Sequence, residues 1–177
     1  MPVASLMTAS PIPSANNFIS LIEDPRVQRL RASLSGAELF LVGGALRSFL
    51  LGSHSGEASP EDDRANCSLE SPDLDFACSL PPDICMERLH ASGIYAVMTN
   101  TKHLTVTAVP IVGSKAVEIT SFRSPVVVGQ SALVVGSDIT TDLGFRDLTV
   151  NALALDCETG EVIDPWSGIA DLQSGVL

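Results

Sequence analysis

The chain has 177 residues, of which 45% are hydrophobic and 18% are charged, a composition typical of one globular domain and short for two. No apolar run reaches the roughly 18 residues of a membrane span, and the first 20 residues contain no Lys or Arg, so we expect neither a membrane protein nor a leader peptide. The four cysteines lack zinc-like spacing, which indicates reduced thiols in a cytoplasmic protein, and the net charge of −11 predicts weak binding to nucleic acid by this chain alone.

Hydrophobic periodicity divides the first half of the chain into short elements. In chain order we predict a loose arm at 1–20, a helical region at 17–34 that breaks at Asp24-Pro25, a strand at 39–42, a helix at 45–51 that ends at Gly52, a polar loop at 53–72, a strand within 71–79 and a helix at 83–93. The loop is rich in Ser, Glu, Asp and Pro, so we interpret it as an acidic insertion in a folded domain that spans 21–177.

The second half of the chain contains more strand signals than helix signals. These are strands at 94–98, 103–112 and 116–122, an apolar segment at 124–135 without an assignment, a helix that begins near Asp147 and runs toward a strand, and a hairpin that turns at Thr159-Gly160. Strands and helices without a regular alternation, together with a hairpin, indicate the α+β class.

Two aspartates stand one residue apart in SPDLDFACS at 71–79. Because side chains alternate along a strand, Asp73 and Asp75 are expected to share one face, and Leu74 and Phe76 the other. Two carboxylates held this close repel each other unless a cation lies between them. The pattern alone is compatible with a solvated strand face or with a divalent-cation site.

Other residues could cooperate with these aspartates. Glu118 lies on another predicted strand, and three carboxylates from adjacent strands form the oxygen-rich site that Mg²⁺ prefers. Gly43-Gly44 precedes a helix whose free N–H groups suit a phosphate, although a lone Gly-Gly is more often a turn without a ligand. Arg47 would point toward the same helix end. Arg123 and Arg146 could meet a triphosphate or form surface ion pairs.

The order of these features resembles the class II nucleotidyltransferases, the family of tRNA CCA-adding enzymes and bacterial poly(A) polymerases. The similar stretches are LVGGALRSFLLG at 41–52, PDLDFACS at 72–79, VEITSFRS at 117–124, DLGFRDLTVNALALD at 142–156 and IDPWSGIADLQSGVL at 163–177. They follow the family's order across 39–177, and the last two are long enough to be specific. The resemblance implies a polymerase β-like catalytic head, an α+β fold with a mixed sheet flanked by helices.

The resemblance also implies roles for the matching residues. Asp73 and Asp75 would hold two Mg²⁺ ions, with Glu118 as the third catalytic carboxylate that helps to activate an RNA 3′-hydroxyl. The implied nucleotide-binding residues are Gly43, Gly44, Arg47, Arg123, Arg146, Asp147 and Asn151. The implied reaction is in-line attack of the hydroxyl on the α-phosphate of ATP or CTP with release of pyrophosphate, in tRNA CCA addition or poly(A) addition.

Four features depart from the family pattern. Ser48 stands where the family has Asp after the arginine of its first helix, and Phe145 stands where it has the first of two arginines. The polar loop at 53–72 is longer and adds negative charge beside the site. The family's neck, with its E-D-x-x-R helix, and its basic body and tail have no counterpart up to Leu177.

These departures leave three interpretations open. The chain is a catalytic head that alone binds ATP or CTP and an RNA 3′ end, with tRNA favoured, only weakly. Alternatively, it is a catalytically degenerate or regulatory module, which Ser48 and Phe145 favour and the retention of three costly carboxylates opposes. In the third interpretation, a helical partner chain supplies base selection and RNA binding.

Overall fold

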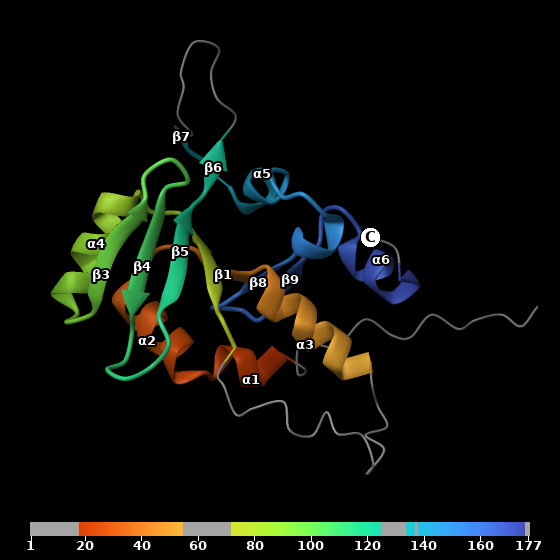
Figure 1. Ribbon diagram of the computed structural model, residues 1–177, viewed down its shortest axis with the longest axis horizontal. Helices are drawn as coiled ribbons and strands as arrows, with labels where there is room; N and C mark the ends of the chain where they lie inside the picture. The colour runs from red at the N-terminus through yellow and green to blue at the C-terminus, as the bar shows by residue number, and fades with distance from the viewer. Residues whose placement is uncertain (1–17, 55–71, 125–133, 137, 176–177) are drawn as a thin grey trace, which may run out of the picture.

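The computed structural model describes residues 18–54, 72–124, 134–136 and 138–175, which form a mixed sheet of seven strands with flanking helices (Figure 1). The strand order across this sheet is β3-β4-β5-β2-β1-β8-β9. The strands are β1 Leu39–Val42, β2 Asp75–Cys78, β3 Tyr95–Asn100, β4 Thr105–Val109, β5 Val117–Ser121, β8 Ala154–Asp156 and β9 Val162–Ile163. Of these neighbours only β2 and β5 run parallel, so the predicted α+β class with a mixed sheet is confirmed.

Short helices and a small ribbon complete the described fold. The helices are α1 Ile19–Ile22, α2 Pro25–Ser33, α3 Gly44–His54, α4 Pro82–Ala91, α5 Ile139–Leu143, the 3₁₀ helix η3 Thr149–Asn151 and α6 Gly168–Ser174. The ribbon pairs β6 Arg123–Ser124 with β7 Val134–Val135. Within the described ranges, none of the helices has the length and apolar character needed to cross a membrane.

The larger hydrophobic core lies on one face of the sheet. Leu39 and Leu41 of β1 point into it, as does Phe76 of β2, because alternate side chains of a strand share a face. The helices add Val27 and Leu30 from α2, Leu46 and Leu50 from α3, and Cys85 and Leu89 from α4. This packing excludes water and fixes the strand ends from which the site is built.

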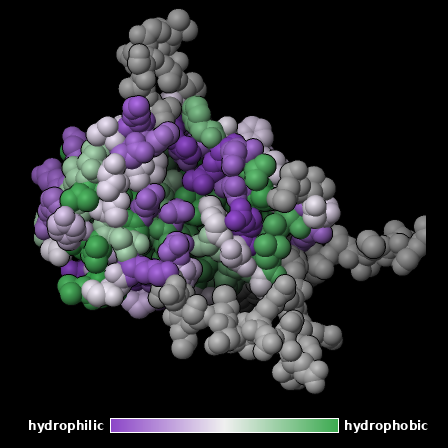
Figure 2. All heavy atoms as spheres, viewed as in Figure 1, coloured by the Kyte–Doolittle hydropathy of each residue, from purple (hydrophilic) through white to green (hydrophobic). Residues whose placement is uncertain are grey.

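The opposite face of the sheet is only partly covered. Phe40 and Val42 point to this side and join a smaller core with Phe122 and with Ile139 and Leu143 of α5. In Figure 1 no helix lies in front of β3, β4 and β5, and Figure 2 shows hydrophilic side chains across the middle of the same view. Asp75 of β2 and Glu118 of β5 are exposed on this face, whereas Ala77 of β2 is buried in the smaller core.

The N-terminal boundaries differ in detail from the predicted ones. Residues 1–17 lie outside the described residues, whereas Phe18 is 1% exposed and its ring centroid lies 5.3 Å from that of Phe49, so the packed region begins within the expected arm. The predicted break at Asp24-Pro25 is confirmed, because Asp24 caps α2 by accepting a hydrogen bond from the main-chain N–H of Arg26.

Helix α3 does not end at Gly52, as the sequence suggested, but runs through His54. A glycine in a helix is tolerated at a cost of about 1 kcal/mol, and the packing of α3 through Leu46 and Leu50 offsets it. Of the polar loop at 53–72, residues 55–71 lie outside the described residues.

The prediction of a helix from Asp147 was wrong. The helix of this region, α5, ends at Leu143, and only the 3₁₀ turn η3 precedes β8. Leu153 and Leu155 enter the larger core whereas Ala152 and Ala154 enter the smaller one, so the apolar run alternates as a strand does. The hairpin prediction is confirmed by the antiparallel pairing of β8 and β9.

Candidate active site

A row of paired residues crosses the open face of the sheet at the level of Asp75. Asp75 of β2 pairs with Glu118 of the parallel strand β5, while Glu118 also pairs with Thr107 of β4 and Asp75 with Val42 of β1. Paired residues point to the same side of a sheet, with neighbouring strands about 5 Å apart. The structure therefore places two of the three predicted carboxylates side by side on adjacent strands.

Asp73 stands just outside this row. Strand β2 begins at Asp75, so Asp73 precedes the strand, but the predicted alternation holds: Asp73 and Asp75 are exposed, whereas Leu74 and Phe76 are buried. The side chain of Asp73 is 88% exposed, and its Oδ1 lies 3.4 Å from Nζ of Lys115. The segment is anchored by Arg26, whose Nη1 donates to the main-chain oxygen of Pro72 at 3.1 Å. Asp73 therefore lies next to the row, and its carboxylate contacts the ammonium group of Lys115.

The pKa of Asp75 is raised above its ordinary value. Loss of water around the carboxyl group is the largest cause, the positive charge of Arg146 opposes it, and the negative charge of Asp73 adds to it. A divalent cation would relieve that repulsion, and carboxylate oxygens are the donors that Mg²⁺ prefers, so the chemistry of these donors fits this ion.

The three predicted carboxylates are not equivalent: Asp75 and Glu118 are paired on adjacent strands, whereas Asp73 contacts Lys115. Across the described ranges of the chain, no group of three His, Cys, Asp or Glu side chains is placed to hold a metal ion.

Gly43 brings the main chain against the Asp75 carboxylate. Its φ of +76° lies in the left-handed region, which glycine adopts at little cost. A Cβ atom at this position would lie 3.5 Å from Oδ2 of Asp75 and 3.4 Å from Nη1 of Arg146. Gly44 then begins α3, and a Cβ atom there would lie 4.0 Å from Nη2 of Arg47. The turn therefore lies between a carboxylate and two guanidinium groups, at the positive end of a helix.

Arg47, Asn151 and Asp147 form a hydrogen-bonded chain that connects α3 to η3. Nη1 of Arg47 donates to Oδ1 of Asn151, and Nδ2 of Asn151 donates to Oδ1 of Asp147 at 3.2 Å. The hydrogen bond from Asn151 is the largest cause of the lowered pKa of Asp147. Arg47 is thus linked to two predicted nucleotide-binding residues that lie about 100 positions further along the chain.

Arg123 faces a protein carboxylate. Its Nε donates to Oδ1 of Asp142 at 2.7 Å, and its Nη2 donates to Oδ2 at 3.2 Å. The guanidinium carbon also lies 5.8 Å from the ring centroid of Phe145. Arg123 is therefore paired with a protein carboxylate, whereas Arg146 is the predicted cation that lies against Gly43.

Arg146 is held in a partly dehydrated position. Burial is the largest cause of its lowered pKa, the charge of Asp142 opposes this effect and the charge of Arg123 adds to it. Its Nε is buried and has no hydrogen-bond partner among the described residues. Arg146 and Arg123, together with Thr120 and His103, line a depression of about 320 Å³.

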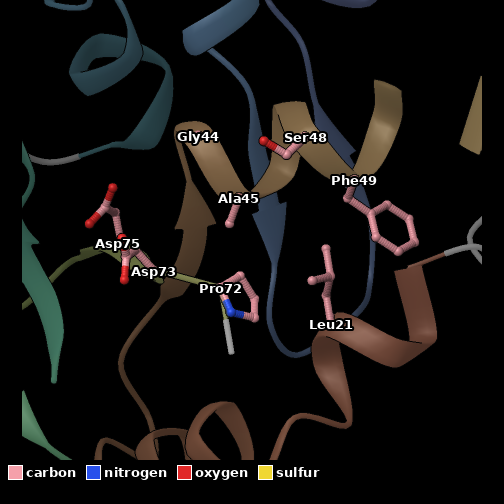
Figure 3. Close-up of a pocket in the computed structure, with 8 residues that line it drawn as sticks. All are labelled: Leu21, Gly44, Ala45, Ser48, Phe49, Pro72, Asp73 and Asp75. Carbon is pink, nitrogen blue, oxygen red and sulfur yellow. The ribbon is translucent and has the colours of Figure 1, made fainter. Parts of the chain in front are cut away.

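A pocket of about 530 Å³ opens beside the aspartates (Figure 3). Its lining residues are Leu21, Gly44, Ala45, Ser48, Phe49, Pro72, Asp73 and Asp75. Figure 3 shows the two carboxylates at one end and Leu21 and Phe49 at the other. Ser48, where the family pattern has Asp, lies on the wall of this pocket, which gives solvent access to the carboxylates from the side of α3.

The closing stretch of the sequence acts as a scaffold for η3. Asp164 accepts a hydrogen bond from the main-chain N–H of Gly168 at 2.7 Å, at the start of α6. A Cβ atom on Gly168 would lie only 2.2 Å from the main-chain oxygen of Thr149, so this close approach requires glycine. Oγ1 of Thr149 also donates to Oδ2 of Asp171 at 2.6 Å. These contacts fix the turn that carries Asn151.

Sequence reasoning missed two charged residues of this region. Lys115 lies three positions before Glu118, and a cation so close to a predicted acidic site was a signal that could have been used. Asp142 stands in the stretch quoted at 142–156, but its burial depends on the packing of α5 and leaves no trace in the local pattern.

Comparison with known proteins places these features in a family. Residues 39–177 match the family model described as the Poly A polymerase head domain. A CC-adding tRNA nucleotidyltransferase of Shouchella clausii is 33% identical over 144 residues, which are 81% of this chain and 29% of that protein. A multifunctional CCA protein of Nitrosomonas europaea is 55% identical over 42 residues, which are 24% of this chain and 10% of that protein.

Solved structures show the same fold. The CCA-adding enzyme of Bacillus stearothermophilus in complex with CTP has a TM-score of 0.61 and 27% identity, and the match covers 89% of this chain and 32% of that chain. A CCA-adding enzyme in an apo form has a TM-score of 0.66 at 22% identity, over 91% of this chain and 36% of that chain. The chain thus spans about a third of the length of the relatives that it matches along most of its own length. It belongs to the Poly A polymerase head domain family.

Proposed function

We propose that this chain transfers a nucleotide from ATP or CTP to the 3′-hydroxyl of an RNA, with release of pyrophosphate and without a template. The observation that carries the proposal is the row in which Asp75 stands beside Glu118 while Gly43 lies against the same aspartate. Relatives named CC-adding and CCA-adding enzymes favour a tRNA 3′ end over poly(A) addition.

Magnesium is the proposed cofactor, as it is for this family in general. We assign two ions to Asp73 and Asp75, with Glu118 as the third catalytic carboxylate. When bound, Mg²⁺ supplies positive charge that activates a hydroxyl and stabilises a leaving oxygen. Asp75 must be ionised to bind a cation, so its raised pKa makes the site dependent on pH.

The sheet order supports an assignment of the two substrates to opposite sides of Asp75. Gly43 follows β1 and Glu118 lies on β5, and these strands flank β2. In-line transfer places the attacking hydroxyl and the leaving pyrophosphate on opposite sides of the α-phosphate. We therefore assign the triphosphate to the side of Gly43 and Arg146, and the RNA 3′-hydroxyl to the side of Glu118.

The departures from the family pattern do not favour a degenerate module. Ser48 removes a charge beside Arg47, but Asn151 accepts a hydrogen bond from this arginine and orients it instead. Phe145 replaces a cation, yet its ring lies near the guanidinium of Arg123. The negative charge of Asp73 adds to the raised pKa of Asp75, and such repulsion between neighbouring carboxylates is costly to keep without a function.

RNA binding by this chain alone is proposed to be weak. The net charge of −11 repels phosphate groups, so a basic surface from a helical body domain or a partner chain would complete the RNA site. We place this activity in the cytoplasm.

The proposal is tested with the 177-residue chain, radiolabelled ATP or CTP and a short RNA with a free 3′-hydroxyl. We expect slow extension that requires Mg²⁺, shows little base preference and is lost in Asp75→Asn. Glu158→Gln is the control, since it also removes one carboxylate charge but lies in an ion pair with Arg31, in another part of the fold. Extension that survives in Asp75→Asn would contradict the proposed site, and ordered C-C-A addition would contradict the proposed need for a further domain.

A further inference from the structure

Asp142 is the one carboxylate that is buried among the described residues. It lies in α5 and is 1% exposed, whereas the other buried polar residues of the described ranges are Arg26, Thr105 and Ser121. A buried carboxylate is strongly unfavourable unless it is paired and hydrogen-bonded. Asp142 is therefore expected to have a positively charged partner that also donates hydrogen bonds to it.

Four hydrogen bonds join Asp142 to a single arginine. Its Oδ1 accepts from the main-chain N–H and from Nε of Arg123, at 3.0 and 2.7 Å, and its Oδ2 accepts from Nη2 at 3.2 Å. The same Nη2 donates to the main-chain oxygen of Asp142 at 3.3 Å. This forked arrangement fixes both the position and the plane of the guanidinium group, because two parallel N–H groups meet one carboxylate.

Asp142 also acts on a second arginine. Arg146 is partly dehydrated, and the charge of Asp142 is the strongest influence that keeps it protonated, against burial and the like charge of Arg123. Without Asp142, two guanidinium groups would repel each other in a region of reduced solvation. Arg146 is in turn the cation whose Nη1 lies near Gly43.

We propose that Asp142 is a positioning residue that holds Arg123 and Arg146 together on the wall of one depression, with Arg146 beside Gly43, and so gives the site its preference for a triphosphate over a monophosphate. The inference rests on the proposed function. Asp142 does not itself touch the nucleotide; it acts through the two arginines, whose combined charge matters most for the β- and γ-phosphates.

The test compares the affinities of the 177-residue chain for ATP and for AMP, each with Mg²⁺, measured by displacement of a fluorescent ATP analogue. In Asp142→Asn we expect ATP to bind about tenfold more weakly, the loss that corresponds to one charge-assisted hydrogen bond, and AMP to change by less than about twofold. The readout is the ratio of the dissociation constants for ATP and AMP. Partial unfolding lowers both affinities by the same factor, so its effect cancels in this ratio. Glu158→Gln should leave the ratio unchanged.

Two outcomes separate this inference from the proposed function. If the natural chain fails to bind ATP with Mg²⁺ at millimolar concentration, the proposed function is wrong and the role of Asp142 falls with it. If the natural chain binds ATP and Asp142→Asn keeps the same ratio, only the role of Asp142 is overturned.

A second variant covers the case in which Asp142→Asn does not fold. Replacement of the whole pair by apolar residues, Arg123→Met with Asp142→Leu, avoids an unpaired buried charge and is commonly tolerated. We expect this double variant to fold and to lose the preference for ATP over AMP. An unchanged preference in the double variant would overturn the proposal.

Discussion

The two faces of the central sheet differ in composition: one carries buried apolar side chains and the other carries neighbouring carboxylates. On the packed face, Phe76 and Leu41 are each 1% exposed and belong to the larger hydrophobic core. On the open face, one residue away along β2, Asp75 stands beside Glu118 and carries a raised pKa. The first face stabilises the fold, whereas the second keeps charges that the fold alone would not favour.

This difference separates the roles of adjacent residues. Loss of a side chain from the packed face should lower stability, and any loss of activity should follow from unfolding. Loss of a charge from the open face should lower activity while stability is kept or improved. A stability–activity trade-off of this kind is expected where like charges are gathered at a site.

The largest effect on stability is expected for Phe76→Ala. This change removes a fully buried ring and leaves a cavity, so the free energy of unfolding should fall by about 3–5 kcal/mol. Urea unfolding followed by circular dichroism measures it. Asp75→Asn, at the neighbouring position on the other face, is the matched control and should show no such loss.

The largest effect on activity is expected for that same Asp75→Asn variant. Loss of the central carboxylate should reduce Mg²⁺-dependent extension of a short RNA by about a hundredfold or more, in line with the removal of a key electrostatic group from an active site. Melting temperature without added metal should stay the same or rise slightly. A marked fall in melting temperature would show that Asp75 serves the fold and not the site.

A smaller effect is expected for Gly43→Ala, and Gly36→Ala gives a matched control. Both glycines have φ near +80°, so either change should lower the free energy of unfolding by about 1–2 kcal/mol. Only Gly43 has a carboxylate and a guanidinium within 4 Å of the added methyl group. Affinity for ATP should therefore fall in Gly43→Ala alone; equal affinities in the two variants would remove the turn from the site.

The free energy of unfolding and the affinity for Mg²⁺ should both change modestly with pH, in opposite directions. The pKa of Asp75 in the folded chain lies above its ordinary value, so the folded chain binds more protons than the unfolded chain at pH values between the two. The free energy of unfolding without metal therefore falls as pH rises through this window. Binding of Mg²⁺ should change in the opposite sense and weaken as pH falls through the same window. Thermal unfolding and metal titration across pH 4–7 measure both, and Asp75→Asn should flatten both curves.

The smallest effect is expected far from the site, for Glu158→Gln. Its carboxylate pairs with Arg31 at 2.8 Å but is 80% exposed, and such pairs contribute less than about 1 kcal/mol. Neither unfolding in urea nor RNA extension should change beyond that limit. A larger loss would mean that charge outside the open face also matters.

The elements of the fold were predictable where a local pattern decides them. The strand at 39–42, the break at Asp24-Pro25 and the hairpin at Thr159-Gly160 follow from apolar runs, proline chemistry and a turn residue. The helix predicted from Asp147 failed because its apolar residues serve two cores on opposite faces of the sheet, which only the tertiary structure defines. The same lack of local signal hid the burial of Asp142 in α5.

The candidate site was predictable as a set of residues but not as an arrangement. Asp75, Glu118 and Gly43 lie together as the motifs suggested. Asp73 and Asp75 alternate with the buried Leu74 and Phe76 as expected, but the contact between Asp73 and Lys115 was not predicted. Arg123 was expected near a triphosphate, a role that stays a prediction, but its hydrogen bond to Asp142 was not foreseen. Side chains of opposite charge find their partners through space, and spacing along the chain does not reveal them.

Titration with Mn²⁺, a paramagnetic substitute for Mg²⁺, followed by nuclear magnetic resonance tests most directly where a cation binds. If acidic side chains on the uncovered side of the sheet form the metal site, amide signals around Asp75, Glu118 and Gly43 should broaden first, and Asp75→Asn should abolish the effect. Broadening that begins elsewhere, or none at millimolar Mn²⁺, would contradict the assignment.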